Sequence, residues 1–279
     1  MNTQKIWLVT GASKGLGLAL VKKLLKENYQ VAATTRNLQS LKDAVNYSES
    51  NFLPLEVDLI NEESVDKAIN NIIKKFGKID IVVNNAGYGQ AGTLEELSDK
   101  ESRKNFDVNV FGALNIIRRI MPLFRSKKSG HIINIASVAG FIGNFPSFGV
   151  YCATKFALVG LTEALSAEAK AFGINATVVY PGYFRTNFLE NNSFSLPKNP
   201  IREYEEARAI EKLHTDEING NQAGDPDKAA VALIEITKSN TPPIHLFLGS
   251  DAYQFAKEKI KIIENELEKN KTLTTSTDF

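Results

Sequence analysis

Short apolar runs alternate with longer amphipathic segments along most of the chain. The short runs are rich in Val and Ile and are mostly apolar throughout, as is typical of parallel strands covered by helices on both faces. The pattern predicts about seven strands, at Ile6–Thr10, Gln30–Thr35, Phe52–Val57, Ile79–Asn84, His131–Ala136, Asn175–Tyr180 and Ile244–Leu248.

The longer segments between these runs carry apolar residues at helical spacing. They predict helices at Gly15–Asn28, Leu38–Tyr47, Glu62–Phe76, Asp99–Arg125, Tyr151–Phe172 and Asp227–Thr237. A regular order of strand, helix and strand indicates an α/β fold with a doubly wound parallel sheet of the Rossmann type.

Two regions depart from this alternation. Residues 183–225 form a long insertion, with Pro197 and Pro200 early and a helix predicted at Arg202–Ile218; insertions of this length often serve as lids over a site. Residues 251–279 are predicted to form a charged helix up to Lys269 and a polar tail, frayed from Thr272. We therefore expect one Rossmann-type domain over residues 1–250, including the lid, followed by this extension.

Composition and charge narrow the class of protein. Thirty-three Lys and Arg balance 32 Asp and Glu, which argues against nucleic acid or an anionic membrane as the main partner. The single cysteine, Cys152, fits a reducing compartment, and no segment has the apolar length of a signal sequence or a membrane helix. His131, His214 and His245 lie too far apart for a zinc motif. We expect a cytoplasmic protein with no membrane span and no metal.

The first strand is followed by a glycine-rich turn, Thr10-Gly-Ala-Ser-Lys-Gly-Leu-Gly17. Glycines let a backbone turn sharply and approach a pyrophosphate at the N-terminus of the next helix. Such a turn is weak evidence alone, because loops use glycine for geometry, but its place between strand and helix predicts a dinucleotide site.

The end of the second strand bears on which dinucleotide is preferred. An NAD site commonly has an acidic residue here, whereas this chain has Arg36 and, in the glycine-rich turn, Lys14. Either cation alone is more often a solvated loop residue. Both together, without the acid, favour a 2′-phosphate and hence NADP(H) over NAD(H).

Tyr151 and Lys155 lie one helical turn apart, and Ser137 lies at the end of a predicted strand. Strand ends of this kind face the ligand crevice of a doubly wound sheet. An ammonium close to a phenol lowers the phenol's pKa. Alone, Tyr-x-x-x-Lys is usually a helix-surface pair; with the glycine-rich turn and Ser137 it predicts a catalytic group.

These motifs together resemble the short-chain dehydrogenase/reductase family, and within it the hydroxysteroid and retinol dehydrogenase branch. The matching features, which span about Lys5 to Leu248, are Thr10–Gly17, Asn84-Asn-Ala-Gly87, Asn109, Ser137, Tyr151-x-x-x-Lys155, Pro181-Gly182 and Thr186. The chain departs from the usual pattern in Leu16, where Ile is more common, and in its longer insertion and C-terminal helix.

The resemblance implies a catalytic role for four residues. Tyr151 would be the general acid in carbonyl reduction and the base in alcohol oxidation, and Ser137 would orient the substrate oxygen. Lys155 would hold the ribose hydroxyls, and Asn109 would help to hold a relay water. The resemblance also implies a set of cofactor-binding residues: Gly11, Ser13, Lys14, Gly15, Leu16, Gly17, Arg36, Asp58, Leu59, Asn85, Ala86, Gly87, Tyr151, Lys155, Pro181, Gly182 and Thr186.

Some of these residues have a second interpretation. Asp58 would bind the adenine amino group, or alternatively cap the helix that follows. Asn84 is expected to tie strands together rather than to bind the cofactor.

Aromatic residues indicate the substrate. Phe141, Phe145, Phe148, Tyr183, Phe184 and Phe188 are predicted to line a pocket for a bulky apolar ketone or alcohol, although about half of such rings are ordinary core. Cys152 is expected to be a packing residue. His214, in the insertion, is either a pocket residue or, as is more common for a lone histidine, exposed.

The preferred interpretation is an NADP(H)-dependent carbonyl reductase or alcohol dehydrogenase. The alternatives are an epimerase or dehydratase of the family's extended branch and an NADP(H) sensor with little turnover. The resemblance also implies a homo-oligomer, dimer or tetramer, packed through the segments 99–125 and 151–172.

Overall fold

The computed structural model describes residues 5–45, 50–190 and 193–279. Its centre is a parallel sheet in the order β3-β2-β1-β4-β6-β7-β9. These strands are β1 (Ile6–Val9), β2 (Gln30–Thr35), β3 (Phe52–Glu56), β4 (Ile81–Asn84), β6 (Gly130–Ile135), β7 (Ile174–Pro181) and β9 (His245–Leu248). The predicted Rossmann-type α/β fold is confirmed, and each strand lies within two residues of its predicted ends.

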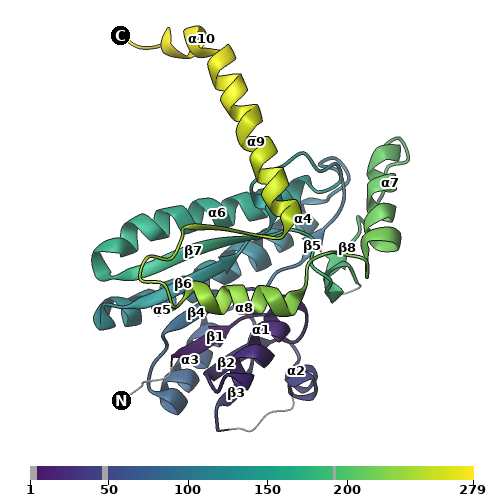
Figure 1. The fold of residues 1–279 in the computed structure, drawn as a ribbon. Coiled ribbons are helices and arrows are strands. Elements are labelled where there is room, and N and C mark those ends of the chain that lie inside the picture. Colours follow the sequence, from purple (N-terminus) through teal and green to yellow (C-terminus); the bar gives the residue numbers. More distant parts are fainter. Residues whose placement is uncertain (1–4, 46–49, 191–192) are drawn as a thin grey trace.

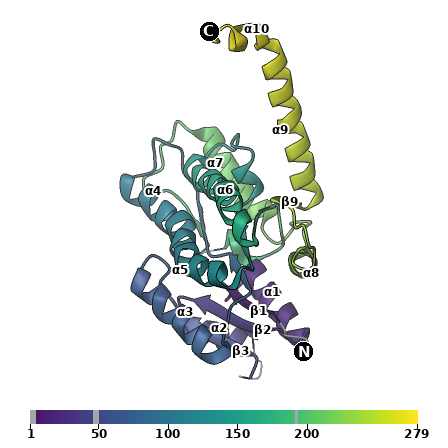
Figure 2. The same ribbon diagram turned by 90° about the vertical axis from the view of Figure 1, so that its left-hand side faces the viewer.

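Helices cover both faces of this sheet (Figures 1 and 2). Trp7 and Val9 of β1 pack with α1 (Gly15–Lys26), α2 (Leu38–Val45) and α8 (Pro226–Ile236). Leu8, between them, points to the opposite face, which packs with the other helices. Those are α3 (Glu62–Phe76), α5 (Gly112–Lys127) and α6 (Gly149–Ala169). Successive strand residues are therefore buried on opposite sides, which explains the uninterrupted apolar runs.

The predicted helix Asp99–Arg125 is divided into three parts. It consists of α4 (Asp99–Phe106), a π-helical turn (Asp107–Phe111) and α5. The π turn wraps around Asn109, whose buried side chain bonds to the backbone of Tyr88, so a tertiary contact interrupts the regular helix. For another predicted helix, Leu38–Tyr47, the last two residues, 46 and 47, lie outside the described residues.

The 183–225 insertion contains more structure than its sequence predicted. Its strand β8 (Phe194–Ser195) pairs with β5 (Gly89–Gln90), and each has only two residues. The predicted helix Arg202–Ile218 begins later, as α7 (Glu205–Lys212), and continues as a π-helical stretch, Leu213–Ile218.

The C-terminal extension is helical almost to its end. Helix α9 (Ser250–Lys269) is followed by α10 (Lys271–Thr275), so helical structure extends past Thr272, where the sequence predicted a frayed tail. The Thr275 hydroxyl donates to the carbonyl of Lys271, which contributes to the extra turn. Within residues 5–45, 50–190 and 193–279, no helix has the length and hydrophobicity required to cross a bilayer.

Candidate active site

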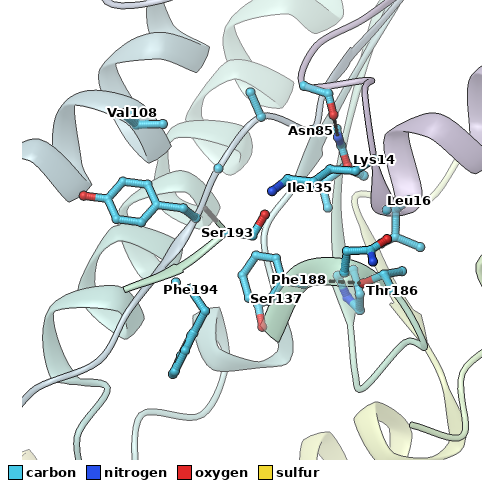
Figure 3. A pocket seen from close by; sticks show the side chains of 18 of the residues that line it. Lys14, Leu16, Asn85, Val108, Ile135, Ser137, Thr186, Phe188, Ser193 and Phe194 are labelled. Carbon is cyan, nitrogen blue, oxygen red and sulfur yellow. Dashed lines mark hydrogen bonds between the residues drawn. The ribbon is translucent and has the colours of Figure 1, made fainter. Parts of the chain in front are cut away.

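A cavity of about 1090 Å³ lies at the carboxyl ends of the central strands. Figure 3 shows Lys14, Leu16 and Thr186 on one side of it and Phe194 on the other. Most of the residues predicted from sequence line this cavity, namely Gly11, Ser13, Lys14, Gly15, Leu16, Arg36, Asp58, Leu59, Asn85, Ala86, Gly87, Ser137, Phe145, Tyr151, Lys155, Pro181, Gly182, Tyr183, Phe184, Thr186 and Phe188. The fold thus collects residues that are distant in sequence.

The glycine-rich turn is held by close backbone contacts. Gly11 has a φ of +63°, and a Cβ there would lie 2.7 Å from the Cα of Ala86. The Asn85 side-chain amide donates to the carbonyls of Thr10 and Gly11, both at 3.0 Å. Gly17 does not line the cavity; a Cβ on it would lie 2.4 Å from Asn85 Nδ2. Gly11 and Gly17 are therefore required by packing of the turn, and Asn85 fixes its shape.

The N-terminus of α1 opens toward the cavity. Among the described residues no side chain caps it, and its first turn contains no acidic residue. The helix dipole and the free amides make this end suitable for an anion.

Lys14 and Arg36 supply positive charge beside this helix end. Burial lowers the pKa of Lys14, and repulsion from Arg36 lowers it further, so the two cations lie close enough to interact. Arg36 is exposed, which leaves its guanidinium accessible. The pair forms a cationic corner of the cavity.

Asp58 occupies the next strand end but does not cap the helix. Asn61 is the N-cap of α3 and accepts from the Ser64 amide at 3.0 Å. Asp58 instead accepts from the amide of Ile60, two residues later, at 3.1 Å. The capping alternative for Asp58 is therefore wrong. Asn84 donates to Asn134 on the neighbouring strand at 2.8 Å, which agrees with its predicted role between strands.

Ser137, Tyr151 and Lys155 meet in the middle of the cavity. Ser137 lies two residues beyond the end of β6, and the other two project from the first turns of α6. The Lys155 ammonium donates to the carbonyl of Ile135 at 3.0 Å and lies 5.7 Å from the centre of the Tyr151 ring. The Ser137 hydroxyl accepts from the amide of Ala139 at 3.1 Å, which leaves its own proton free to donate.

Burial dominates the ionisation of this group. It raises the pKa of the Tyr151 phenol, and a hydrogen bond from Ser137 offsets only part of the effect. Burial also lowers the pKa of Lys155 to about 8. The expected depression of the phenol's pKa by Lys155 does not appear: besides burial, the groups that act on the Tyr151 pKa are Ser137, Cys152 and Tyr183.

Asn109 lies behind the cavity. Its amide nitrogen donates to the carbonyl of Tyr88 and to the Thr154 hydroxyl, both at 3.0 Å, and its oxygen accepts from the Tyr88 amide at 3.0 Å. The side chain thereby connects the π turn to the segment after β4 and to α6. Its predicted part in holding a water stays a prediction.

The other half of the cavity is largely aromatic. Phe145, Tyr183, Phe184 and Phe188 line it as predicted, whereas Phe141 does not. Phe141 packs edge-on against Tyr180 and Phe247, with ring centres 5.8 and 5.2 Å apart. Its assignment to the substrate pocket is therefore wrong, because the chain after Ser137 turns this ring into the core.

Several lining residues were not singled out in the sequence, namely Leu189, Ser193, Phe194 and Gln222. Phe194 forms part of the short strand β8 and lies in no periodic pattern. Phe148, one residue before α6, and His214, which the sequence left open as a pocket residue, also line the cavity.

His214 is buried rather than exposed, and it makes two hydrogen bonds. Its Nδ1 lies 2.8 Å from the carbonyl of Ile210, and its Nε2 lies 3.0 Å from the Tyr183 hydroxyl. A carbonyl only accepts, so Nδ1 carries the proton and Nε2 accepts from Tyr183. Burial lowers the pKa of His214, which favours this neutral form. The pair is a polar element within an aromatic wall.

The insertion is attached to the body by a charged network. Arg208 of α7 lies 2.7 Å from Glu96 and 3.0 Å from Glu211, and Glu211 accepts from Ser147. Glu96 also accepts from the amide of Ile201 at 2.7 Å. These contacts hold the insertion, several of whose residues line the cavity, against the body.

Comparison with known proteins points to one family. The sequence model of the family described as short chain dehydrogenase matches residues 5–195 of this chain. A 3-ketodihydrosphingosine reductase of Bacteroides thetaiotaomicron is 33% identical over 267 residues, covering 95% of this chain and 95% of that protein.

Solved structures agree with this match. A short-chain dehydrogenase from Streptomyces avermitilis has a TM-score of 0.90 and 32% identity, over 98% of this chain and 100% of that one. ElxO with NADP bound has a TM-score of 0.74 and 26% identity, over 90% and 99% of the two chains.

Proposed function

Because the chain belongs to the short-chain dehydrogenase/reductase family and is an oxidoreductase of it, we propose that it interconverts a bulky hydrophobic ketone and its secondary alcohol with NADP(H). The observation that carries the proposal is the meeting of Ser137, Tyr151 and Lys155 between a cationic corner and an aromatic wall.

The residues present fit a dinucleotide. The N-terminus of α1 is open, and Gly11 and Gly15, with φ values of +63° and +59°, leave its approach without side chains. Asp58 and Leu59 would lie along the adenine, and Asn85, Ala86 and Gly87 along the adenosine side. Pro181, Gly182 and Thr186 would contact the nicotinamide end. The nicotinamide would supply or accept the hydride.

The chain's own groups would manage the proton. Tyr151 would give its phenolic proton to the carbonyl oxygen during reduction and take it back during oxidation. The Ser137 hydroxyl accepts from the Ala139 amide and donates toward Tyr151, and it would donate to the same oxygen when substrate is bound. Lys155 donates to the Ile135 carbonyl, and its remaining protons would bond the ribose hydroxyls.

The preference for NADP(H) rests on Lys14 and Arg36. Their mutual repulsion would be relieved by the dianionic 2′-phosphate, which NADP(H) carries and NAD(H) lacks.

The substrate proposal rests on the aromatic half of the cavity. Phe148, Phe188 and Phe194 surround the Tyr151 side, with ring centres 6.4 Å from Tyr151 for Phe148 and 6.2 Å for Phe188. Such walls bind apolar groups through burial of their surface. The similarity to a reductase of 3-ketodihydrosphingosine is consistent with a long apolar ketone.

We further propose that copies associate through α4, α5 and α6. Phe111, Leu123 and Phe156 expose 48%, 38% and 44% of their surface on this side of the chain. Light scattering that detects only monomer at working concentration would remove this part of the proposal.

The test is a fluorescence titration with NADPH and NADH, followed by an absorbance assay with hydrophobic ketones. We expect tighter binding of NADPH and oxidation of NADPH by at least one ketone. NADPH binding without turnover across a broad panel would contradict the reductase, and no binding of either nucleotide would contradict the cofactor site.

A further inference from the structure

Helix α9 projects away from the rest of the molecule (Figures 1 and 2). Its first turns are anchored, because Ala252 and Ala256 are buried and Phe255 packs against Phe145 at 6.2 Å between ring centres. Asp251 also accepts from the Tyr183 amide at 2.6 Å. From Ile260 to Lys269, in contrast, every residue is exposed. The outer half is about 15 Å long at 1.5 Å per residue.

An apolar stripe runs along this exposed helix. Tyr253, Ile260 and Leu267 are seven residues apart, and Ile263 lies between the last two. These four side chains expose 57%, 42%, 60% and 40% of their surface, respectively. The spacing is that of the a and d positions of a coiled coil. The stripe therefore has the pattern of a helix-packing seam. Among the described residues, its outer part, from Ile260 to Leu267, is exposed and packs against neither the strands of the sheet nor the helices that cover it.

The apolar face of the outer half of α9 is unpacked. Most helical stability in proteins comes from packing of an apolar face. Because the seam from Ile260 outward is exposed, a partner that covers it would add such packing.

The charges beside the seam identify the kind of partner. With Ile260 at an a position, Lys257 and Lys259 flank the seam on its inner side, and Glu264 and Glu266 flank it further out. An antiparallel second copy would place the lysines of each helix against the glutamates of the other. It would also keep the two bodies at opposite ends of the pair.

A membrane surface fits this helix less well. Helices that lie in a membrane interface are rich in Lys and Arg on their polar face. Residues 257–269 carry four lysines and four glutamates, so the helix has no net charge to draw it to an anionic lipid surface.

We propose that α9 is a self-association helix, which pairs antiparallel with α9 of a second copy through Ile260, Ile263 and Leu267. This contact is separate from the proposed α4–α6 interface and independent of the reaction.

The first test uses the full chain and two neighbouring isoleucines. Ile263→Ser removes a seam residue, whereas Ile262→Ser makes the same change about 100° around the helix, away from the seam centre. By concentration-dependent light scattering or analytical ultracentrifugation, Ile263→Ser should halve the average mass and Ile262→Ser should leave it unchanged. Equal masses for the wild type and both variants would overturn the proposal, as would an equal loss in both variants.

The second test reverses the charges. A variant with Lys257→Glu and Lys259→Glu, and a variant with Glu264→Lys and Glu266→Lys, should each lose this association because like charges face each other. Mixing the two should restore it, because one helix is then acidic and the other basic. Loss without restoration on mixing would contradict the pairing.

Vesicle co-sedimentation tests the alternative that a membrane surface, rather than a second copy, covers the seam. With phosphatidylcholine/phosphatidylglycerol vesicles, the wild type should stay in the supernatant. The proposal would be overturned if the wild type did not self-associate through α9 but bound the vesicles, and if Ile263→Ser lost this binding. The seam would then belong to a membrane contact.

Discussion

Arg36→Ala should change the choice of nucleotide more than the binding of nucleotides in general. A hydrogen bond involving a charged group contributes about 1.5–3 kcal/mol. Because Arg36 is exposed, its contribution should lie near the lower value. About 1.4 kcal/mol corresponds to tenfold in Kd, so NADPH binding should weaken roughly tenfold. NADH lacks the 2′-phosphate, so its Kd should change less than about twofold.

Fluorescence titration with both nucleotides measures this difference, and salt provides a second test. At about 1 M salt the Debye length falls to about 3 Å, so the wild-type preference for NADPH should shrink while that of Arg36→Ala changes little. Lys42→Ala is the matched control, because Lys42 is an exposed cation on α2 that does not line the cavity. Equal losses for NADPH and NADH would refute the reasoning and make Arg36 an ordinary solvated cation.

Three further changes test the packing and the electrostatics. Gly17→Ala should weaken NADPH binding at least tenfold, because its Cβ would lie 2.4 Å from Asn85 Nδ2. Gly160→Ala, at an exposed position of α6 with nothing within 4 Å, should instead stabilise the protein by about 0.5–1 kcal/mol; equal effects of the two changes in titration and thermal melts would contradict this. Phe141→Ala should lower the free energy of unfolding by about 2–3 kcal/mol, somewhat less than for a fully buried ring, and should leave KM for any accepted ketone unchanged. A raised KM without destabilisation would indicate that Phe141 contacts the substrate. Burial lowers the pKa of His131 to about 4, below its unfolded value of about 6.5, so the wild type should lose up to about 3 kcal/mol as pH falls from 6.5 to 4. Denaturant unfolding of His131→Gln should lack this component, and an unchanged pH slope would contradict it.

The parts of the site carried by local motifs could be predicted from sequence. The turn from Gly11 to Gly17, Ser137 after its strand, and Tyr151 with Lys155 on one helix face all follow from a strand end or a helical repeat. Parallel strands bring such ends to one edge, so their meeting follows from the fold class.

The rest depends on contacts that have no period in the sequence. Phe141 and Phe145 lie in the same irregular segment, and only the packing of Phe141 on Tyr180 and Phe247 separates core from cavity. The burial of His214 did not follow from the sequence, because its partner, Tyr183, is 31 residues away. The pKa of Tyr151 depends on burial, which a spacing of four residues does not reveal.

The proposed mechanism depends on Tyr151 as the group that gives its phenolic proton to the carbonyl oxygen. The most direct measurement is a single-turnover reaction of enzyme preloaded with NADPH, comparing wild type with Tyr151→Phe on any ketone that the wild type reduces. In Tyr151→Phe, we expect the NADPH affinity to stay within about twofold of the wild type. The rate of nicotinamide oxidation should fall at least 10²-fold, roughly the contribution of a positioned general acid. A near-normal rate in Tyr151→Phe with intact NADPH binding would contradict the assigned mechanism.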